Sequence, residues 1–143
     1  QRQMCIRDSR DAAHQNAVDH KFHEDELRLG DAVKNGSTGE TAEQLYETLR
    51  HVFFAKQIAL LQSEAGEALE ADRKHRRCTA NLDAVKDEWS FKHWVKDTVE
   101  DELADVFIRL MDTCGWLGID IEKHVELKMK YNASREALHG KAY

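Results

Sequence analysis

The sequence predicts an all-α protein, organised as an antiparallel helical bundle. The chain has 143 residues with no proline and only 7 glycines. β-Sandwiches and barrels of this size need many tight turns, which normally recruit both residue types. Apolar residues also recur at intervals of three and four over long stretches, which is the period of one face of an α-helix. A chain of this length is expected to form a single domain.

The charge and hydropathy of the chain limit its partners and its location. The net charge is −6, and a domain that binds a nucleic-acid polymer usually carries a basic face instead. No stretch approaches the roughly eighteen uninterrupted apolar residues of a membrane span. The beginning of the chain also lacks a hydrophobic signal core. We therefore expect a cytoplasmic protein that binds neither a nucleic-acid polymer nor a membrane.

The N-terminal third is the least regular part of the pattern. Residues 1–10 have no helical apolar stripe, so we expect a non-native or disordered leader there and assign the single domain to residues 11–143. Residues 11–34 are periodic but weakly apolar, which predicts one or two exposed helices. The clearest loop follows at residues 35–39, where asparagine, glycine and serine favour turns.

Three long amphipathic helices are predicted after this loop. The first covers residues 41–77, and its start is marked by Thr41 and Gln44 at the spacing of a capping box. Its last turn, residues 73–77, is basic, which suits the end of a helix. Its apolar stripe consists of Phe54, Ile58, Leu61, Ala65 and Leu69. We expect this stripe to face the core.

A second long helix is predicted over residues 91–116, after a loop and a short helix within residues 78–89. Its expected buried stripe consists of Val95, Val99, Leu103, Val106, Phe107, Leu110, Met111 and Cys114. Gly115 and Gly118 bracket its end, and Asp120 is a suitable N-cap for a last helix over residues 121–138. Short connections between such helices favour antiparallel packing.

Two pairs of acidic residues lie beside the apolar stripes. Glu64 and Glu67 are three residues apart, as are Glu102 and Asp105, so each pair projects from one side of its helix. Either pair alone would usually be a solvated face, but packing of the two stripes would bring all four carboxylates together. Two such charges about 4 Å apart repel by roughly 4 kcal/mol at an effective dielectric near 20. Protonation or a cation must relieve this repulsion, and all-oxygen ligands suit Mg²⁺, or Mn²⁺, better than Zn²⁺. A small residue at Gly66 would let a facing helix or a ligand approach closely.

The last predicted helix carries the complementary charge. Lys128, Asn132 and Arg135 follow one another at steps of four and three and therefore share a face. Lysine and arginine neutralise phosphate oxygens, and an asparagine amide can hold a water, a sugar or a base edge. Without the acidic pairs, a solvated helix face would be an equally good interpretation.

Together these patterns resemble the MazG-like, all-α nucleoside triphosphate pyrophosphohydrolases, particularly their small phage and bacterial members. The resemblance covers about residues 54–141 and rests on ExxE at 64–67, ExxD at 102–105 and the segment KMKYNASREALHGK at 128–141. It implies a helical bundle completed by oligomerisation, as a homodimer or homotetramer. It also implies Mg²⁺-dependent hydrolysis of a (deoxy)nucleoside triphosphate to the monophosphate and pyrophosphate, as in nucleotide-pool house-cleaning.

The resemblance also assigns roles to residues. The acids that would hold Mg²⁺ are Glu64, Glu67, Glu102 and Asp105. The ion would bridge phosphate oxygens and lower the pKa of a bound water, whose proton Glu67 would take. Lys128 and Arg135 would stabilise charge developing on the phosphates, and Asn132 would contact the nucleotide or a water.

Substrate specificity is the part that the resemblance leaves open. Phe53, Lys56 and Gln57 precede Glu64 by one to three turns on roughly the same side of the helix, and they are candidate base contacts. Residues 68–101 form a longer connection than many relatives have. Its aromatic residues are Trp89, Phe91 and Trp94. We expect them to pack an inserted helix against the bundle or a partner subunit, with a lid or a base-stacking wall as the alternative.

Several alternative functions stay open. A dUTP- or dCTP-selective diphosphatase and a phosphoribosyl-ATP pyrophosphohydrolase are close alternatives, and a non-catalytic helical module that oligomerises or binds nucleotide is a more distant one. A ferritin-like di-iron protein would need ExxH pairs, which the four acidic positions do not offer. His20 and His23, with Asp19 and Glu24, could ligate a transition metal. We interpret these histidines as part of a polar helix surface instead.

Overall fold

A computed structural model describes residues 5–36 and 40–135, and these residues form helices joined by turns and loops, with no strand. The prediction of an all-α protein is therefore confirmed for the described part of the chain. The elements are α1 (Ile6–Asp19), α2 (Glu24–Gly36), α3 (Glu40–Arg73), a 3₁₀ turn (Leu82–Ala84), α4 (Glu88–Trp94), α5 (Val99–Trp116) and α6 (Ile121–Ala133). None of the described helices combines the length and the apolar character that crossing a lipid bilayer requires.

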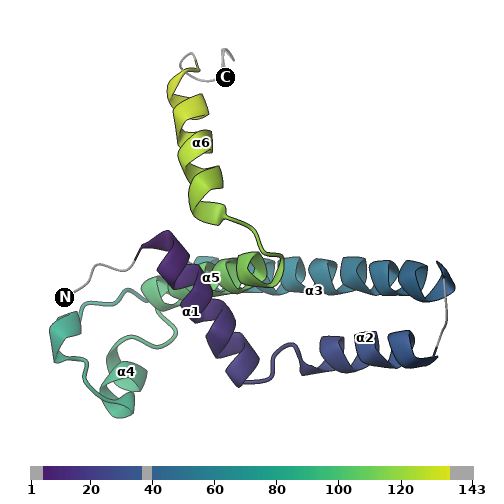
Figure 1. Cartoon of the computed structure of the whole chain (residues 1–143). Coiled ribbons are helices and arrows are strands. Elements are labelled where there is room, and N and C mark those ends of the chain that lie inside the picture. The colour runs from purple at the N-terminus through teal and green to yellow at the C-terminus, as the bar shows by residue number, and fades with distance from the viewer. Residues whose placement is uncertain (1–4, 37–39, 136–143) are drawn as a thin grey trace.

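The long helix α3 and helix α5 form the centre of the molecule and run antiparallel (Figure 1). The end of α3 meets the start of α5, where the Val99 backbone nitrogen donates a hydrogen bond to the Arg76 carbonyl oxygen at 3.1 Å. Nearer the end of α5, Arg109 pairs with Glu64. Helix α2 returns alongside α3, α1 crosses α5, and α6 packs on α1 and points away from the central pair (Figure 1).

Several helix boundaries differ from the expected ones. Helix α3 ends at Arg73 and not at residue 77, because His75 has a positive φ of 56°, so most of the basic run 73–77 follows the helix instead of forming its last turn. The helix expected over residues 91–116 is divided into α4 and α5. The cause is local, because Asp97 has a positive φ of 61°, a conformation that an α-helix cannot contain. Thr98 then caps α5 by accepting a hydrogen bond from the Asp101 backbone nitrogen at 3.3 Å.

Asp120 is confirmed as the N-cap of α6. It comes two residues after Gly118, whose φ of 66° turns the chain between α5 and α6. Helix α6 ends at Ala133 with Ser134 as its C-cap, before the end that was expected at about residue 138.

The N-terminal segment differs from the expectation of a leader outside the fold. Helix α1 begins at Ile6, and Arg10 Nη1 donates a hydrogen bond to the Ile119 carbonyl oxygen at 3.0 Å. Residues 5–10 therefore belong to the folded unit, because a long-range contact holds them against the loop that precedes α6. Residues 1–4 lie outside the described part of the chain.

The predicted apolar stripes are only partly buried. Val99, Met111 and Cys114 on α5 are buried as expected, but Leu103 and Phe107 are 55% and 45% exposed. On α3, Phe54, Ala65 and Leu69 are exposed. The residues that α3 buries are Gln57, Glu64, Ala68 and Ala71. The expectation that these whole stripes face the core of a single chain is wrong. Periodicity locates an apolar face but does not say which surface covers it.

Two glycines in the helices have opposite surroundings. A Cβ at Gly115 would lie 2.4 Å from the Cβ of His14, so α1 crosses α5 at this point with no room for a side chain. A Cβ at Gly66 would meet no described atom within 4 Å. The close approach of a facing helix, one of the two expectations at Gly66, is therefore absent among the described residues and occurs at Gly115 instead, while approach of a ligand at Gly66 stays a prediction.

Candidate functional site

Three acidic side chains from two helices meet at the interface between α3 and α5. Glu64 and Glu67 of α3 and Glu102 of α5 each offer a carboxylate oxygen, and these oxygens lie within 4.8 Å of one another. Glu64 and Glu102 are buried, with 9% and 7% of their surface exposed, whereas Glu67 is open to solvent. The antiparallel packing of the helices brings the two sequence motifs together. We refer to these three residues as the acidic cluster.

The charge of the acidic cluster is only partly compensated within the chain. Arg109 donates a hydrogen bond from Nε to Glu64 Oε1. Burial, and then the charges of Glu67 and other nearby acids, raise the pKa of Glu102 above its usual range. A raised pKa means that the folded chain resists carrying the full negative charge. The cluster therefore fits a small divalent cation that prefers oxygen ligands, such as Mg²⁺ or Mn²⁺.

Asp105 lies beside the acidic cluster but outside that group of three. Burial, and then the charges of Asp101 and Glu64, raise its pKa. Asp105 lines a cavity of about 350 Å³ together with Lys56 and Gln57. The structure thus places two of the three candidate base contacts on one cavity with the fourth predicted metal ligand.

A second hollow adjoins the opposite side of the acidic cluster. Glu67 and Glu102 line a pocket of about 170 Å³ together with Lys74 and Arg76. Arg73 and Arg77 are paired with acidic side chains, whereas Arg76 has no ion pair among the described residues. From the sequence, the preferred interpretation of the basic run 73–77 is a helix end, with Arg73 as its one candidate phosphate contact, and Arg76 is not singled out. The position of this basic run, shortly after Glu64 and Glu67 in the sequence, indicates that it could lie near the acidic cluster. Only the path of the chain after α3 shows that Arg76 is the residue that lines the pocket.

Arg76 also links this pocket to a wider cleft of about 620 Å³ that α4 helps to form, and Trp94 and Lys96 lie on its wall. The three aromatic residues of the 68–101 connection are largely exposed, at 68% for Trp89, 42% for Phe91 and 48% for Trp94. Packing of these side chains into the bundle of the same chain is therefore not observed. A partner subunit, a lid or a base-stacking wall stays a prediction.

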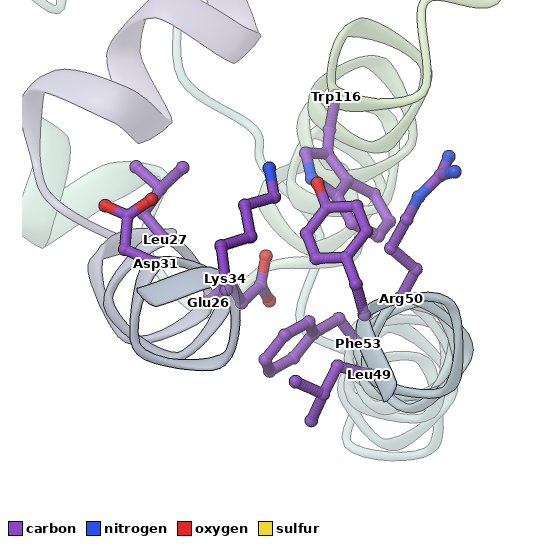
Figure 2. Close-up of a pocket in the computed structure, with 10 residues that line it drawn as sticks. Glu26, Leu27, Asp31, Lys34, Leu49, Arg50, Phe53 and Trp116 are labelled. Carbon is purple, nitrogen blue, oxygen red and sulfur yellow. The ribbon is translucent and has the colours of Figure 1, made fainter. Parts of the chain in front are cut away.

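Phe53 lies apart from the other two candidate base contacts. It lines a separate pocket of about 100 Å³ with Leu49 and Arg50 of α3, residues of α2, and Trp116 (Figure 2). Its side chain points toward α2, as Figure 2 shows. Phe53 and Gln57 share a side of α3 but lie one turn, about 6 Å, apart along its axis, and their side chains line different hollows.

The three predicted phosphate-binding residues of the last helix are not brought to the acidic cluster within one chain. Lys128, Asn132 and Arg135 are all exposed. The charged groups of Lys128 and Arg135 lie 5.2 Å and 5.5 Å from the centre of the Tyr131 ring. Because α6 extends away from α3 and α5 (Figure 1), these groups face solvent.

A second cluster of titratable groups joins α1, the turn before α2, and α5. Asp112 Oδ1 lies 2.9 Å from His14 Nδ1 and 3.0 Å from His23 Nε2. The hydrogen bond to Asp112, assisted by one to Glu26, raises the pKa of His23. The sequence grouped His23 with His20, but His20 is exposed and its Nδ1 contacts the Asn16 carbonyl oxygen at 2.8 Å. The interpretation of His23 as part of a polar surface is wrong, because only 4% of it is exposed.

Comparison with known proteins adds no assignment to this geometry. The chain matches no protein-family model, no curated protein and no solved structure.

Proposed function

We propose that this protein is a Mg²⁺-dependent nucleoside triphosphate pyrophosphohydrolase that acts in the cytoplasm as a homo-oligomer. The observation that carries the proposal is the meeting of Glu64, Glu67 and Glu102 at the interface of α3 and α5. The motif resemblance of the sequence supports it, since the same acids form the ExxE and ExxD patterns.

The roles of the acids follow from their surroundings. Mg²⁺ held by the acidic cluster and Asp105 would supply positive charge to phosphate oxygens and acidify water. Glu67 is the exposed member of the cluster, so it is the carboxylate that water can reach and the one we assign as general base. Arg109 holds the buried carboxylate of Glu64 in place through its hydrogen bond.

Cations around the acidic cluster would stabilise the negative charge that develops on the triphosphate. Arg76 and Lys74 line the pocket that Glu67 and Glu102 also line. Arg76 is the better candidate, because Lys74 Nζ lies 3.0 Å from Glu70 Oε1 and is already paired. A guanidinium can also bind two phosphate oxygens at once. Lys56 and Gln57 would contact the nucleotide from the cavity on the Asp105 side.

Oligomerisation would complete the site. Apolar side chains of α3 and α5 that a single chain leaves exposed include Leu69 at 52% and Leu103 at 55%, and Met129 of α6 is 67% exposed. Exposed apolar faces of this kind mark association surfaces. A second copy covering them would allow its Lys128 and Asn132, on α6, and its Arg135, just after α6, to reach the acidic cluster. We therefore propose a homodimer, or a homotetramer built from dimers.

The test is a panel of nucleotides incubated with Mg²⁺ and scored for pyrophosphate against orthophosphate. The panel contains the common and modified (d)NTPs, including dUTP and dCTP, and phosphoribosyl-ATP. We expect pyrophosphate from at least one of them. Glu67→Gln should lower turnover about 100-fold or more, as loss of a general base does, and Asp105→Asn should also lower it. Arg76→Ala should lower it more than Arg73→Ala, because Arg73 lies 3.7 Å from Glu70 and outside the pocket.

A matched control separates the site from the general charge of α3. Glu47→Gln makes the same chemical change on the same helix, at an exposed residue that pairs with Arg50 at 3.2 Å. It should leave turnover unchanged. Absence of pyrophosphate from every nucleotide, or undiminished turnover in both Glu67→Gln and Asp105→Asn, would refute the proposal.

A further inference from the structure

The cluster around Asp112 has the composition of a transition-metal site. One imidazole nitrogen from each of His14 and His23 and one carboxylate oxygen of Asp112 lie within 4.8 Å of one another. The three residues come from α1, the turn before α2, and α5, so a metal bound here would join three segments. Nitrogen ligands distinguish this cluster from the acidic cluster, whose donors are all oxygens.

The distances fit a single ion. His14 Nδ1 and His23 Nε2 lie 2.9 Å and 3.0 Å from Asp112 Oδ1. Ligands about 2.0–2.1 Å from a tetrahedral zinc ion are separated from one another by roughly 3.3 Å. The nitrogen and oxygen atoms therefore need to move apart by only a few tenths of an ångström. Binding would displace the protons that now lie between these atoms.

The residue behind His23 has the place of an outer-sphere partner. The Nδ1 of His23 lies 3.0 Å from Glu26 Oε2, on the side of the ring opposite Asp112. A histidine that binds metal through one nitrogen usually donates its other N–H to a carboxylate in this way, which fixes the tautomer and raises the basicity of the ligand. The hydrogen bond thus prepares Nε2 to bind a metal.

A buried oxygen without a partner is the second, independent observation. Only 4% of the Glu26 side chain is exposed, and Glu26 Oε1 has no hydrogen-bond partner among residues 5–36 and 40–135. The Nζ of Lys56 lies 3.8 Å from Glu26 Oε1, which is within ion-pair range but too far for a hydrogen bond. Within the described part of the chain, the two buried carboxylates Glu26 and Asp112 thus depend for positive charge mainly on the His23 ring, which contacts both, and on Lys56. Such a buried charge is costly unless a cation balances it.

The cluster is also accessible from outside. Asp112 lines the cavity of about 350 Å³ that Asn16, Lys56 and Arg109 border. His14 has 31% of its side chain exposed. A metal at Asp112 would therefore keep a position open toward this cavity, whereas the stacked ring of Trp116 covers His23. Sites with three protein ligands and one open position are the usual form of non-structural zinc sites.

We propose that His14, His23 and Asp112 form a binding site for a divalent transition-metal ion of the zinc type, with Glu26 as the outer-sphere partner of His23. The site is separate from the Mg²⁺ site of the proposed function and does not depend on it. It pins α1 and the turn before α2 to α5, and it presents the bound ion to the cavity beside Asp105.

The experiment is a titration of the chelator-treated full-length protein with Zn²⁺ and with Co²⁺, in a large excess of Mg²⁺ that occupies the acidic cluster. The readouts are the bound stoichiometry, the visible absorption of Co²⁺ and the ¹⁵N shifts of the histidine rings. We expect one ion per chain, an absorption typical of four-coordinate Co²⁺ with nitrogen ligands, and ring shifts at His14 and His23.

Variants test each member of the site. His14→Gln and His23→Gln should each weaken binding at least tenfold, and Glu26→Gln should weaken it about 10- to 100-fold, as loss of an outer-sphere carboxylate does. His20→Gln is the matched control, because it makes the same change at an exposed histidine three residues from His23. It should bind like the unmodified protein. Glu67→Gln should also leave this binding unchanged.

Folding is checked separately, since His23 is buried. His14→Gln removes a partly exposed side chain, so its far-UV circular dichroism should match that of the unmodified protein while its Zn²⁺ affinity falls. Failure of the unmodified protein to bind Zn²⁺ or Co²⁺, or equal affinity in His14→Gln, His23→Gln and His20→Gln, would overturn the proposal. Those results would make the cluster a hydrogen-bonded packing network.

Discussion

Replacement of Gly115 by alanine tests the packing of α1 on α5, on which the histidine cluster depends. The added Cβ would stand 2.4 Å from the His14 Cβ and 2.7 Å from its Cγ, whereas carbon atoms in contact lie about 3.5–4.0 Å apart. These atoms are next to the backbone, so rotation of the His14 side chain cannot clear them. Helix α1 itself has to move by about 1 Å or more.

The magnitude follows from comparison with Gly66→Ala. Alanine in place of a helical glycine stabilises by up to about 1 kcal/mol, and at Gly66 no described atom lies within 4 Å to oppose it. At Gly115 the alanine brings the same gain in helix propensity, but overpacking against His14 costs typically about 1–3 kcal/mol. This cost cancels or exceeds the gain. The two variants should therefore differ in free energy of unfolding by about 1–3 kcal/mol, with Gly66→Ala the more stable.

The assay is urea unfolding followed by far-UV circular dichroism, together with Zn²⁺ affinity. A stability change of this size moves the melting temperature of a chain of this length by several degrees, about 2–4 °C per kcal/mol, so thermal unfolding gives a second readout. Gly115→Ala should also weaken Zn²⁺ binding, since it displaces His14. Equal stabilisation in both variants would refute the packing of α1 across α5 at this glycine.

Two further predictions concern the acidic cluster. Arg109→Gln removes the hydrogen-bonded partner of buried Glu64, so in a chelator it should lower the free energy of unfolding by about 1–3 kcal/mol. Mg²⁺ should restore more stability to this variant than to the unmodified protein in a thermal shift assay, and an equal response would contradict this. The raised pKa of Glu102 means that the folded chain favours the protonated carboxyl. The contribution of this group to the free energy of unfolding is therefore fully present below pH 4.5, the ordinary pKa of a glutamate, and is lost as the pH rises through the raised pKa of the folded chain. Glu102→Gln should therefore be more stable than the unmodified protein near pH 7 without Mg²⁺, by a margin that closes below pH 4.5; a margin independent of pH would contradict the reasoning.

Local geometry made part of this protein predictable from its sequence. Residues three apart on a helix share a side, so Glu64 and Glu67 must project together. The pairing with Glu102 needed only the antiparallel packing that short connections favour. Arg109 was not predicted to hold Glu64, because that contact spans 45 residues. It depends on the rotation of α5 against α3.

The predicted apolar stripes show where periodicity stops being informative. Phe54, Leu69 and Leu103 were placed on buried faces, and 41–55% of each is exposed in the single chain. A period of three and four residues shows that one side of a helix is apolar. It cannot distinguish a surface covered by the same chain from one left for a second copy.

The sequence alone determined that this chain is helical, that α3 is long, and that two acidic pairs lie on its central helices. All of these depend on interactions within a few residues, where composition and spacing are sufficient. The tertiary structure decided which sides of the helices face one another, that α6 extends away from the acidic cluster, and that His14 and His23 reach Asp112 over 98 and 89 residues. These depend on the rotation and crossing of packed helices, which side-chain shapes such as Gly115 set and the periodicity of a single helix does not encode.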